Sequence, residues 1–319
     1  MESLADKLAV VTGGGSGMGR ELVRQLAANG CSVATCDVNA QSAAETAAIA
    51  GAGAQHDILV SSHVCDVADE TQVQRFRDEL LAEHASSHVD LVFANAGIGG
   101  GGSFVTGSRE EWERTFAIDW WGVYNCARVF MPLLIASGEG VLVNTSSVNG
   151  FWASLGPGIP HTAYSAAKFA VKGFSEALIE DLRVNAPHVH VAVVMPGHIG
   201  TDIVANSMRV LGQADPENMS DADIEVLRPA LTGRVAAAGS ASPEELRQIL
   251  VQANRDFRDN APLSAADAAT IILDGVRAGS WRILVGEDAK TLDAAVRAQP
   301  EKAYEYAELF SSPPAAADR

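Results

Sequence analysis

Short runs of β-branched and apolar residues alternate with longer helical patterns over most of this 319-residue chain, and this alternation constrains the fold more than any other feature. It is the pattern of repeated β-α-β units around a parallel sheet. We expect strands at residues 7–12, 31–37, a segment ending near Asp66, 89–94, 140–146, 189–195 and 281–286. Between them we expect helices that include 18–29, 70–84, 109–137 and 165–184. The sequence therefore predicts an α/β fold with one large sheet.

One segment does not follow this alternation. Residues 202–263 are polar, contain several helical fragments and interrupt the rhythm before the last strand. We interpret them as an enlarged lid beside the sheet. The prediction is a single domain over residues 1–319, with this lid and a C-terminal extension at about 287–319 whose last residues, 312–319, form a frayed tail.

The charge and cysteine content exclude several classes of protein. Forty acidic residues against 23 basic ones give a formal charge of −17, which repels nucleic acid and anionic membranes. There is no run of 18 apolar residues and no leader pattern at the start. Four cysteines without paired spacing favour a reducing compartment and no structural metal. We therefore expect a cytoplasmic protein.

A glycine-rich turn follows the first strand and opens a helix. Residues 12–20 read Thr-Gly-Gly-Gly-Ser-Gly-Met-Gly-Arg, in which glycines allow the backbone to approach a pyrophosphate and the helix start binds its charge. Asp37 closes the second strand, where a carboxylate accepts hydrogen bonds from ribose hydroxyls and repels a 2′-phosphate. No Lys or Arg occupies 14–16 or 38–39, so no nearby cation would offset that repulsion. We predict NAD as cofactor; the alternative is that both features are structural turns.

Tyr164 and Lys168 lie four residues apart in a predicted helix and therefore share one face. An ammonium near a phenol favours the phenolate, so we expect Lys168 to lower the pKa of Tyr164 and make it a usable acid/base. Ser147 ends a strand and can hydrogen-bond a substrate oxygen while a nicotinamide moves the hydride. Ser146 is the rival for that role. The set predicts interconversion of a secondary alcohol and a ketone.

Together these motifs resemble the classical short-chain dehydrogenase/reductase family. The matches run in order along the chain: Thr12-Gly13-x-x-x-Gly17-x-Gly19, Asp66-Val67, Asn95-Ala96-Gly97, Ser147, Tyr164 with Lys168, and Pro196-Gly197 with Thr201. They cover about residues 5–201 closely, and then 264–286. The resemblance implies a Rossmann-type, doubly wound, seven-stranded parallel sheet in the order 3-2-1-4-5-6-7 with helices on both faces.

The resemblance also implies roles for individual residues. Ser147, Tyr164 and Lys168 would be catalytic, joined by Asp119. The NAD site would comprise Gly13, Ser16, Gly17, Met18, Gly19, Asp37, Asp66, Val67, Asn95, Ala96, Gly97, Tyr164, Lys168, Pro196, Gly197, Ile199 and Thr201. In this family, helices corresponding to 109–137 and 165–184 pair across subunits, which implies a homodimer or homotetramer; the alternative is burial within the chain.

Three departures from the family pattern are present. Asp119 stands where the family usually has Asn, so it can keep the backbone role in a water relay to the lysine while adding charge. Ser147 and Tyr164 are further apart than usual, with the extra residues in a loop at 151–160, and the segment after Thr201 is longer. The candidate wall of the substrate pocket is mainly apolar and comprises Phe151, Trp152, Leu155, Met195, His198, Ile199 and Ile203.

From that wall we predict a small, mainly apolar alcohol or ketone as substrate; the alternative is that the aromatic residues simply pack the lid. For His161 and His198 we favour a surface or turn role over catalysis. Two other functions stay open: a catalytically silent NAD-binding regulator, and an isomerase or dehydratase of the family's extended branch. The complete set of Ser147, Tyr164 and Lys168 favours an oxidoreductase.

Overall fold

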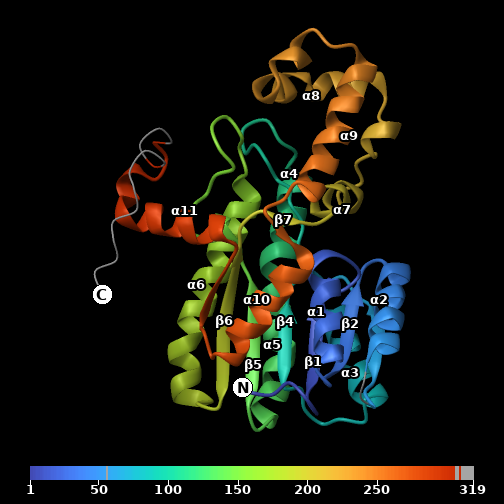
Figure 1. The fold of residues 1–319 in the computed structure, drawn as a ribbon, viewed down its shortest axis with the longest axis vertical. Helices are drawn as coiled ribbons and strands as arrows, with labels where there is room; N and C mark the ends of the chain where they lie inside the picture. The colour runs from blue at the N-terminus through green and yellow to red at the C-terminus, as the bar shows by residue number, and fades with distance from the viewer. Residues whose placement is uncertain (55–56, 306–308, 310–319) are drawn as a thin grey trace.

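A parallel sheet forms the centre of the molecule (Figure 1). The computed structural model describes residues 1–54, 57–305 and 309, with the backbone alone at 229, 230, 233, 234, 236 and 237. The seven strands are β1 Leu8–Thr12, β2 Ser32–Asp37, β3 Val60–Val64, β4 Leu91–Ala94, β5 Gly140–Thr145, β6 Val189–Pro196 and β9 Arg282–Val285. Their order is β3-β2-β1-β4-β5-β6-β9, which confirms the predicted sheet, with β9 as the seventh strand.

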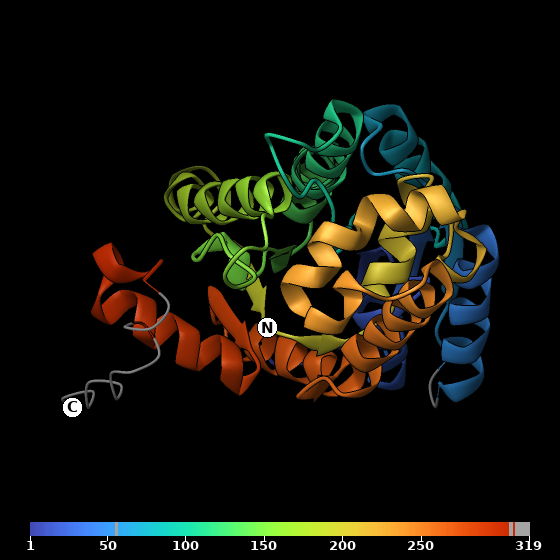
Figure 2. The same cartoon turned by 90° about the horizontal axis from the view of Figure 1, so that it is seen from above.

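Helices cover both faces of this sheet, as Figure 2 shows from above. They are α1 Gly17–Ala28, α2 Ala40–Gly53, α3 Glu70–Glu83, α4 Arg109–Phe116, α5 Gly122–Ala136, α6 Thr162–Asn185 and α10 Ala265–Arg277. One core contains buried residues of α3, α5 and α6, and a second contains those of α1 and α10. Because both faces are covered, every residue of β1, β4 and β5 is buried, as expected for a parallel sheet.

The helix predicted at 109–137 is divided into three parts. A π-helical turn, Ala117–Trp121, separates α4 from α5. Such turns insert one extra residue into the helical ladder and occur often at functional sites. Asp119 lies at the centre of this turn and is completely buried. The division therefore coincides with Asp119, the position at which the sequence analysis expected a departure from the family pattern.

Residues 202–263 form a helical segment that rises above the carboxyl edge of the sheet (Figure 1). It contains α7 Ile203–Val210, α8 Asp221–Arg234 and α9 Pro243–Asp259. The segment begins and ends beside a short parallel pair that the sequence did not predict, β7 Ile199–Gly200 with β8 Leu263–Ser264. This pair holds the two ends of the insertion together at the edge of the main body.

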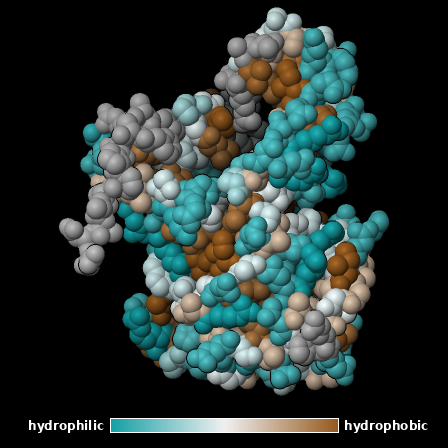
Figure 3. All heavy atoms as spheres, in the orientation of Figure 1, coloured by the Kyte–Doolittle hydropathy of each residue, from teal (hydrophilic) through white to brown (hydrophobic). Residues whose placement is uncertain are grey.

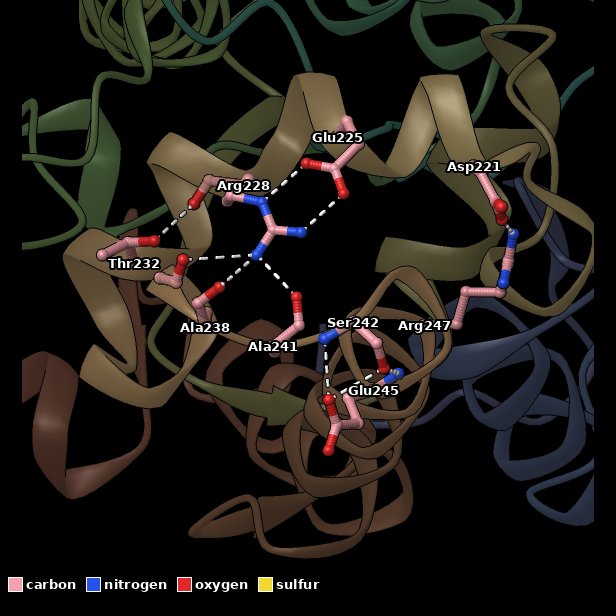
Figure 4. A network of polar contacts seen from close by, with 10 residues as sticks. Asp221, Glu225, Arg228, Thr232, Ala238, Ala241, Ser242, Glu245 and Arg247 are labelled. Atoms are coloured by element: carbon pink, nitrogen blue, oxygen red, sulfur yellow. Dashed lines mark hydrogen bonds and ion pairs between the residues drawn. The ribbon is translucent and has the colours of Figure 1, made fainter.

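The helical segment 202–263 has its own internal contacts. A small core of Met219, Ile224, Leu231, Ala238 and Leu246 is separate from the two cores of the sheet. Arg228 pairs with Glu225, and its Nη1 donates hydrogen bonds to the carbonyl oxygens of Ala238 (2.8 Å) and Ala241 (2.7 Å), as drawn in Figure 4. A capping box of Ser242 and Glu245 begins α9, whose outer face is mainly hydrophilic in Figure 3.

The C-terminal part of the chain packs on the loop that follows β5. Helix α11, Glu287–Ala298, contributes Leu292 to a cluster with Trp152, Ala303 and Leu309. The Trp152 indole N–H donates a hydrogen bond of 2.6 Å to the Ala303 carbonyl. The tail predicted at 312–319 lies outside the described residues. Within the described part of the chain, no helix has both the length and the apolar character required to cross a bilayer.

Two Leu→Ala substitutions distinguish the sheet from the helical segment. Leu142 of β5 and Leu246 of α9 are both fully buried, but they belong to different cores. We expect Leu142→Ala to lower the global free energy of unfolding by about 2–5 kcal/mol, since a core cavity is created. Leu246→Ala should instead accelerate hydrogen exchange within 216–259 while the protection of β1, β4 and β5 is kept. Equal loss of protection in the sheet for both variants would contradict two separate cores.

Candidate active site

The hydroxyl of Thr12, at the end of β1, joins the two loops that form the floor of the site. Thr12 Oγ1 accepts hydrogen bonds from the backbone N–H groups of Asn95 and Ala96, each 3.1 Å long. The Asn95 side chain returns a bond of 3.1 Å to the Thr12 carbonyl oxygen. Neighbouring parallel strands end at the same edge of a sheet, so the loops after β1 and β4 meet here. The predicted residues of both loops are therefore side by side.

Glycine is required at two positions of the loop after β1 for different reasons. Gly13 has φ +68°, in the left-handed region that disfavours other residues. At Gly19 a Cβ atom would lie 2.1 Å from the Gly13 carbonyl oxygen and 2.8 Å from Asn95 Nδ2. The first turn of α1 is consequently held close to the preceding loop, and its N-terminus faces the cavity beside it. This arrangement fits a bound pyrophosphate.

A cavity of about 360 Å³ lies over these loops. Thirteen of the predicted cofactor and substrate residues line it, namely Gly13, Ser16, Gly17, Met18, Gly19, Asp37, Asp66, Val67, Asn95, Ala96, Gly97, Thr201 and Ile203. Tyr164, Lys168, Pro196, Gly197 and Ile199 are not among the residues that line it. The loops after four neighbouring strands, β1, β2, β3 and β4, thus contribute to one elongated site.

Asp37 is held in place by backbone donors at one end of the cavity. Its Oδ2 accepts a hydrogen bond of 3.0 Å from Gly15 N–H, and its Oδ1 accepts one of 2.9 Å from Asn39 N–H. Arg20 lines the same cavity, which corrects the expectation that no cation lies nearby. The prediction was wrong because it considered only positions adjacent in sequence. The Arg20 guanidinium donates to the carbonyl oxygen of Gly15 (2.6 Å) and to Thr46 Oγ1 (3.0 Å).

Asp66 forms an ion pair that was not predicted. Arg114 of α4 lies 2.6 Å from its Oδ2, and Ala68 N–H donates to its Oδ1 at 3.0 Å. Both Asp66 and Arg114 line the cavity. Sequence patterns do not indicate this pair, because the partners are 48 positions apart and meet only in the folded chain, where α4 approaches the loop after β3.

Ser147 and Tyr164 meet at the other side of the site. Ser147 follows β5 and begins a 3-10 helix, Val148–Gly150, where its Oγ accepts a hydrogen bond of 3.1 Å from Asn149 N–H. Its side chain also interacts with the Tyr164 phenol and lowers the pKa of that group. Ser146, the rival, donates its hydroxyl to the main-chain oxygen of Lys168 at 2.7 Å and is 2% exposed. Ser146 thus fixes α6 against β5, whereas Ser147 contacts the phenol.

Lys168 is buried directly behind Tyr164. Its Nζ donates 3.1 Å to the Thr145 carbonyl oxygen, lies 3.3 Å from Asp119 Oδ1, and is 5.3 Å from the centre of the Tyr164 ring. The i, i+4 spacing on α6 brings ammonium and phenol together, as the sequence indicated. The ion pair with the Asp119 side chain was not foreseen in that form, because the expected role of Asp119 used its main chain.

The net direction of the Tyr164 pKa differs from the sequence expectation. Burial raises the pKa of Tyr164, Lys168 lowers it, Asp119 raises it again, and the Ser147 hydrogen bond lowers it; the sum lies above the ordinary value. The lowering effect of Lys168 that the sequence predicted is present, but the predicted acidic phenol does not result, because burial disfavours the phenolate more than the ammonium favours it. Burial likewise raises the pKa of Asp119 to about 6, against the lowering effect of Lys168.

A glycine-rich loop that the sequence analysis missed positions the start of α6. The N–H groups of Thr162 and Ala163 donate to the carbonyl oxygens of Gly102 and Gly101, each at 3.0 Å. At Gly101, with φ +62°, a Cβ would lie 2.3 Å from that of Ala163. The run of four glycines at 99–102 was the available signal. It allows the loop after β4 to satisfy the helix N-terminus that carries Tyr164.

His161 lies against the Tyr164 phenol, a contact that was also not predicted. Its ring stacks on that of Tyr164 with centroids 4.5 Å apart. Burial lowers the pKa of His161 to about 4, so the imidazole is neutral at physiological pH. His161 therefore supports one face of the ring without contributing charge.

The predicted substrate residues separate into distinct environments. Met195 is fully buried in β6, and Trp152 and Phe151 pack with the cluster around α11. His198 packs on Phe257 of α9, with ring centroids 4.3 Å apart, and its Nε2 lies 2.7 Å from that residue's main-chain oxygen. Leu155 is 48% exposed, and Ile203 lines the cavity. For Phe151 and Trp152 this placement supports the alternative that they serve packing.

Helix α7 reaches the glycine loop directly. Asn206 Nδ2 donates a hydrogen bond of 3.0 Å to Ser16 Oγ, and Arg209 Nη1 donates one of 2.9 Å to Asn206 Oδ1. Both side chains line the cavity, as does Val210. These residues were missed because the polar segment after Thr201 carries no motif. The helical segment 202–263 therefore forms part of the wall that faces the glycine loop.

Comparisons with known proteins agree with this geometry. The family model described as short chain dehydrogenase matches residues 7–210. SadH of Mycobacterium tuberculosis, which is named as an oxidoreductase, is 35% identical over 298 residues, covering 93% of this chain and 92% of that protein. A short-chain dehydrogenase/reductase from Burkholderia phymatum, solved in complex with NAD, has 27% identity and a TM-score of 0.73, with 98% and 99% of the two chains covered.

A third comparison extends the likeness to a named reductase. The crystal structure of levodione reductase shares 25% identity and a TM-score of 0.64, covering 90% of this chain and 98% of that one. The glycine turn and the Ser147, Tyr164 and Lys168 cluster lie within residues 7–210, the range that the family model matches. The chain therefore belongs to the classical short-chain dehydrogenase/reductase family of oxidoreductases.

Proposed function

We propose that this protein transfers a hydride between NAD(H) and a secondary alcohol or ketone, with Tyr164 as general acid/base. The observation that carries the proposal is the contact of the Tyr164 phenol with the Ser147 side chain on one side and the buried Lys168 ammonium on the other. When bound, the nicotinamide supplies the hydride. The protein's own residues supply orientation of the substrate oxygen and a proton.

Each residue has a distinct part in this proposal. Ser147 would hydrogen-bond the substrate oxygen, since its hydroxyl already lies beside the phenol. Tyr164 would give its proton to that oxygen during reduction and take it back during oxidation. Lys168, fixed by the Thr145 carbonyl oxygen, stabilises the phenolate that reduction leaves behind. The cavity over the glycine loop would hold the dinucleotide.

The preference for NAD over NADP rests on Asp37. The carboxylate lies in the cavity beside Gly15 and is fixed by two backbone N–H groups, so it cannot turn away from a ribose easily. It would accept hydrogen bonds from ribose hydroxyls and repel a 2′-phosphate. Arg20 does not reverse this preference, because its guanidinium is engaged with Gly15 and Thr46.

The remaining parts of the proposal concern substrate, lid and assembly. A mainly apolar substrate is proposed from Leu155 and Ile203, and the helical segment 202–263 is proposed as the lid because Asn206 contacts Ser16. A homodimer or homotetramer is proposed through residues 109–137 and α6, where Trp121 at the end of the π-helical turn is 47% exposed and Phe169 of α6 is 42% exposed. Light scattering that shows only monomer at micromolar concentration would contradict this assembly.

Tyr164→Phe tests the chemistry. The variant keeps the aromatic ring and its stacking on His161 but lacks the proton that the reaction needs. We expect turnover of a panel of apolar ketones with NADH to fall by about 10²–10⁴-fold, while NADH binding changes little. Tyr124→Phe, in the aromatic cluster of α5, is the matched control and should keep full activity. Undiminished turnover of Tyr164→Phe would refute the proposed mechanism.

Asp37→Ser tests cofactor preference. Loss of the carboxylate removes both the acceptor for the ribose hydroxyls and the repulsion of a 2′-phosphate, so the ratio of NADPH to NADH affinity should rise by about tenfold or more, equivalent to about 1.4 kcal/mol. Fluorescence titration with each reduced dinucleotide measures the ratio. Glu70→Gln removes a carboxylate outside the cavity and should leave it unchanged. A wild-type protein that prefers NADPH would overturn the assignment.

A further inference from the structure

The π-helical turn between α4 and α5 places a carboxylate in contact with the catalytic lysine. Asp119 is 0% and Lys168 2% exposed, and the Oδ1 and Nζ atoms are 3.3 Å apart. Oδ1 also accepts a hydrogen bond of 3.1 Å from Ile98 N–H. Oδ2 is buried and has no hydrogen-bond partner among the described residues. Only one oxygen of the Asp119 carboxylate, Oδ1, therefore contacts the lysine.

The surroundings are shaped to admit this pair. At Gly97 a Cβ atom would lie 2.7 Å from Asp119 Oδ1 and 3.2 Å from Lys168 Nζ, so any larger residue would displace one of them. The backbone after β4 consequently passes close to both charged atoms. A direct ion pair of side chains stands where the family pattern has an uncharged amide.

The charged groups around Asp119 in the described structure are few. Helix α6 contributes Lys168 and Tyr164, the loop after β4 contributes only the Ile98 N–H, and Lys168 in turn contacts the Thr145 carbonyl oxygen of β5. In a buried environment, charges a few ångströms apart interact strongly. The field at the Tyr164 oxygen is therefore set by one ammonium and one carboxylate with opposing effects.

We propose that Asp119 is a positioning residue for the reaction, whose carboxylate offsets the charge of Lys168 and holds Tyr164 in its protonated form at neutral pH. This inference rests on the proposed function. A protonated phenol is ready to give a proton to a carbonyl oxygen, whereas alcohol oxidation needs the phenolate. The pair thus favours carbonyl reduction near pH 7 and confines efficient alcohol oxidation to alkaline pH. An uncharged amide at this position would accept similar hydrogen bonds without offsetting the ammonium.

The direction of each titration agrees with this role. Asp119 raises the pKa of Tyr164, in addition to the larger effect of burial. Burial raises the pKa of Asp119 itself to about 6, so the carboxylate is charged at pH 7 and above. As the pH falls through that value, Asp119 takes up a proton and the ammonium is no longer offset. The offset is therefore present in the neutral and alkaline range, where Tyr164 titrates.

The test is the ionisation of Tyr164 in full-length Asp119→Asn, followed by the ultraviolet absorbance of tyrosinate. The chain has four tyrosines, so the titration of the same protein carrying Tyr164→Phe is subtracted to isolate residue 164. We expect the Tyr164 midpoint to be lower in Asp119→Asn than in wild type by about one pH unit or more, since removing one charge of a close buried pair is an effect of that order. The rising limb of kcat/KM for alcohol oxidation should move to lower pH by the same amount.

Asp90→Asn is the matched control. Asp90 is also buried, at 4% exposed, and binds Leu8 N–H, Ser137 and Lys7 at the opposite edge of the sheet. It should alter stability without moving the Tyr164 midpoint. A midpoint that is the same in Asp119→Asn and wild type would overturn the proposal.

The proposal can fail independently of the variant's folding and of the proposed function. In the wild-type protein the Tyr164 midpoint should lie above the value of about 10 for free tyrosine. A wild-type midpoint well below that value would overturn the inference even if Asp119→Asn did not fold. If Tyr164→Phe kept full turnover, or the protein used neither dinucleotide, the proposed function would fail while the titration could still show the ion pair acting on the phenol.

Discussion

The buried ammonium of Lys168 is the charge that β5, the π-helical turn and α6 contact together at the candidate active site. Taking an ammonium out of water costs several kcal/mol unless partners compensate. Here the compensation comes from three separate elements: the Thr145 carbonyl oxygen of β5, the Asp119 carboxylate of the π-helical turn, and the ring of Tyr164 on the same helix. The sheet, the π-helical turn and α6 are therefore held together by contacts with a single cation. Ser147 lies two residues after Thr145, so its position depends on the same contacts.

Much of this architecture could be predicted from the sequence, because local periodicity and glycine chemistry determine it. The seven strands followed from alternating patterns, their order was implied by the resemblance to the family, and Gly13 and Gly19 followed from the close approach that a helix start requires. Features that depend on contacts between distant segments could not be predicted. Arg114 pairs with Asp66, which is 48 positions away in the sequence. Arg20 lines the cavity from the first turn of α1. The balance of burial against Coulomb attraction at Tyr164 also required the three-dimensional surroundings.

The substrate side was the least predictable part for a related reason. Phe151 and Trp152 follow Ser147 closely in the sequence, and this proximity was the reason for predicting them in a pocket wall. In the structure the C-terminal part of the chain, nearly 150 residues later, provides their apolar partners, including Leu292 and Ala303. An aromatic side chain can be buried by any apolar surface that packs against it, and the sequence alone does not identify which segment provides that surface. The run of four glycines at 99–102, by contrast, is visible in the sequence. Its role is clear only from the structure, in which two of their carbonyl oxygens accept hydrogen bonds from the start of α6.

The dipeptide Gly197-His198 joins the two additions to the common fold. Asp288 of α11 accepts a hydrogen bond of 2.7 Å from His198 N–H, and a Cβ at residue 197 would lie 2.2 Å from its Oδ2. The His198 ring, meanwhile, packs on Phe257 of α9. The insertion and the C-terminal helix thus share one point of attachment directly after β6, although they are separate in sequence. Because both additions contact the same two residues, a displacement of this dipeptide would alter a contact of the insertion and a contact of the C-terminal helix together.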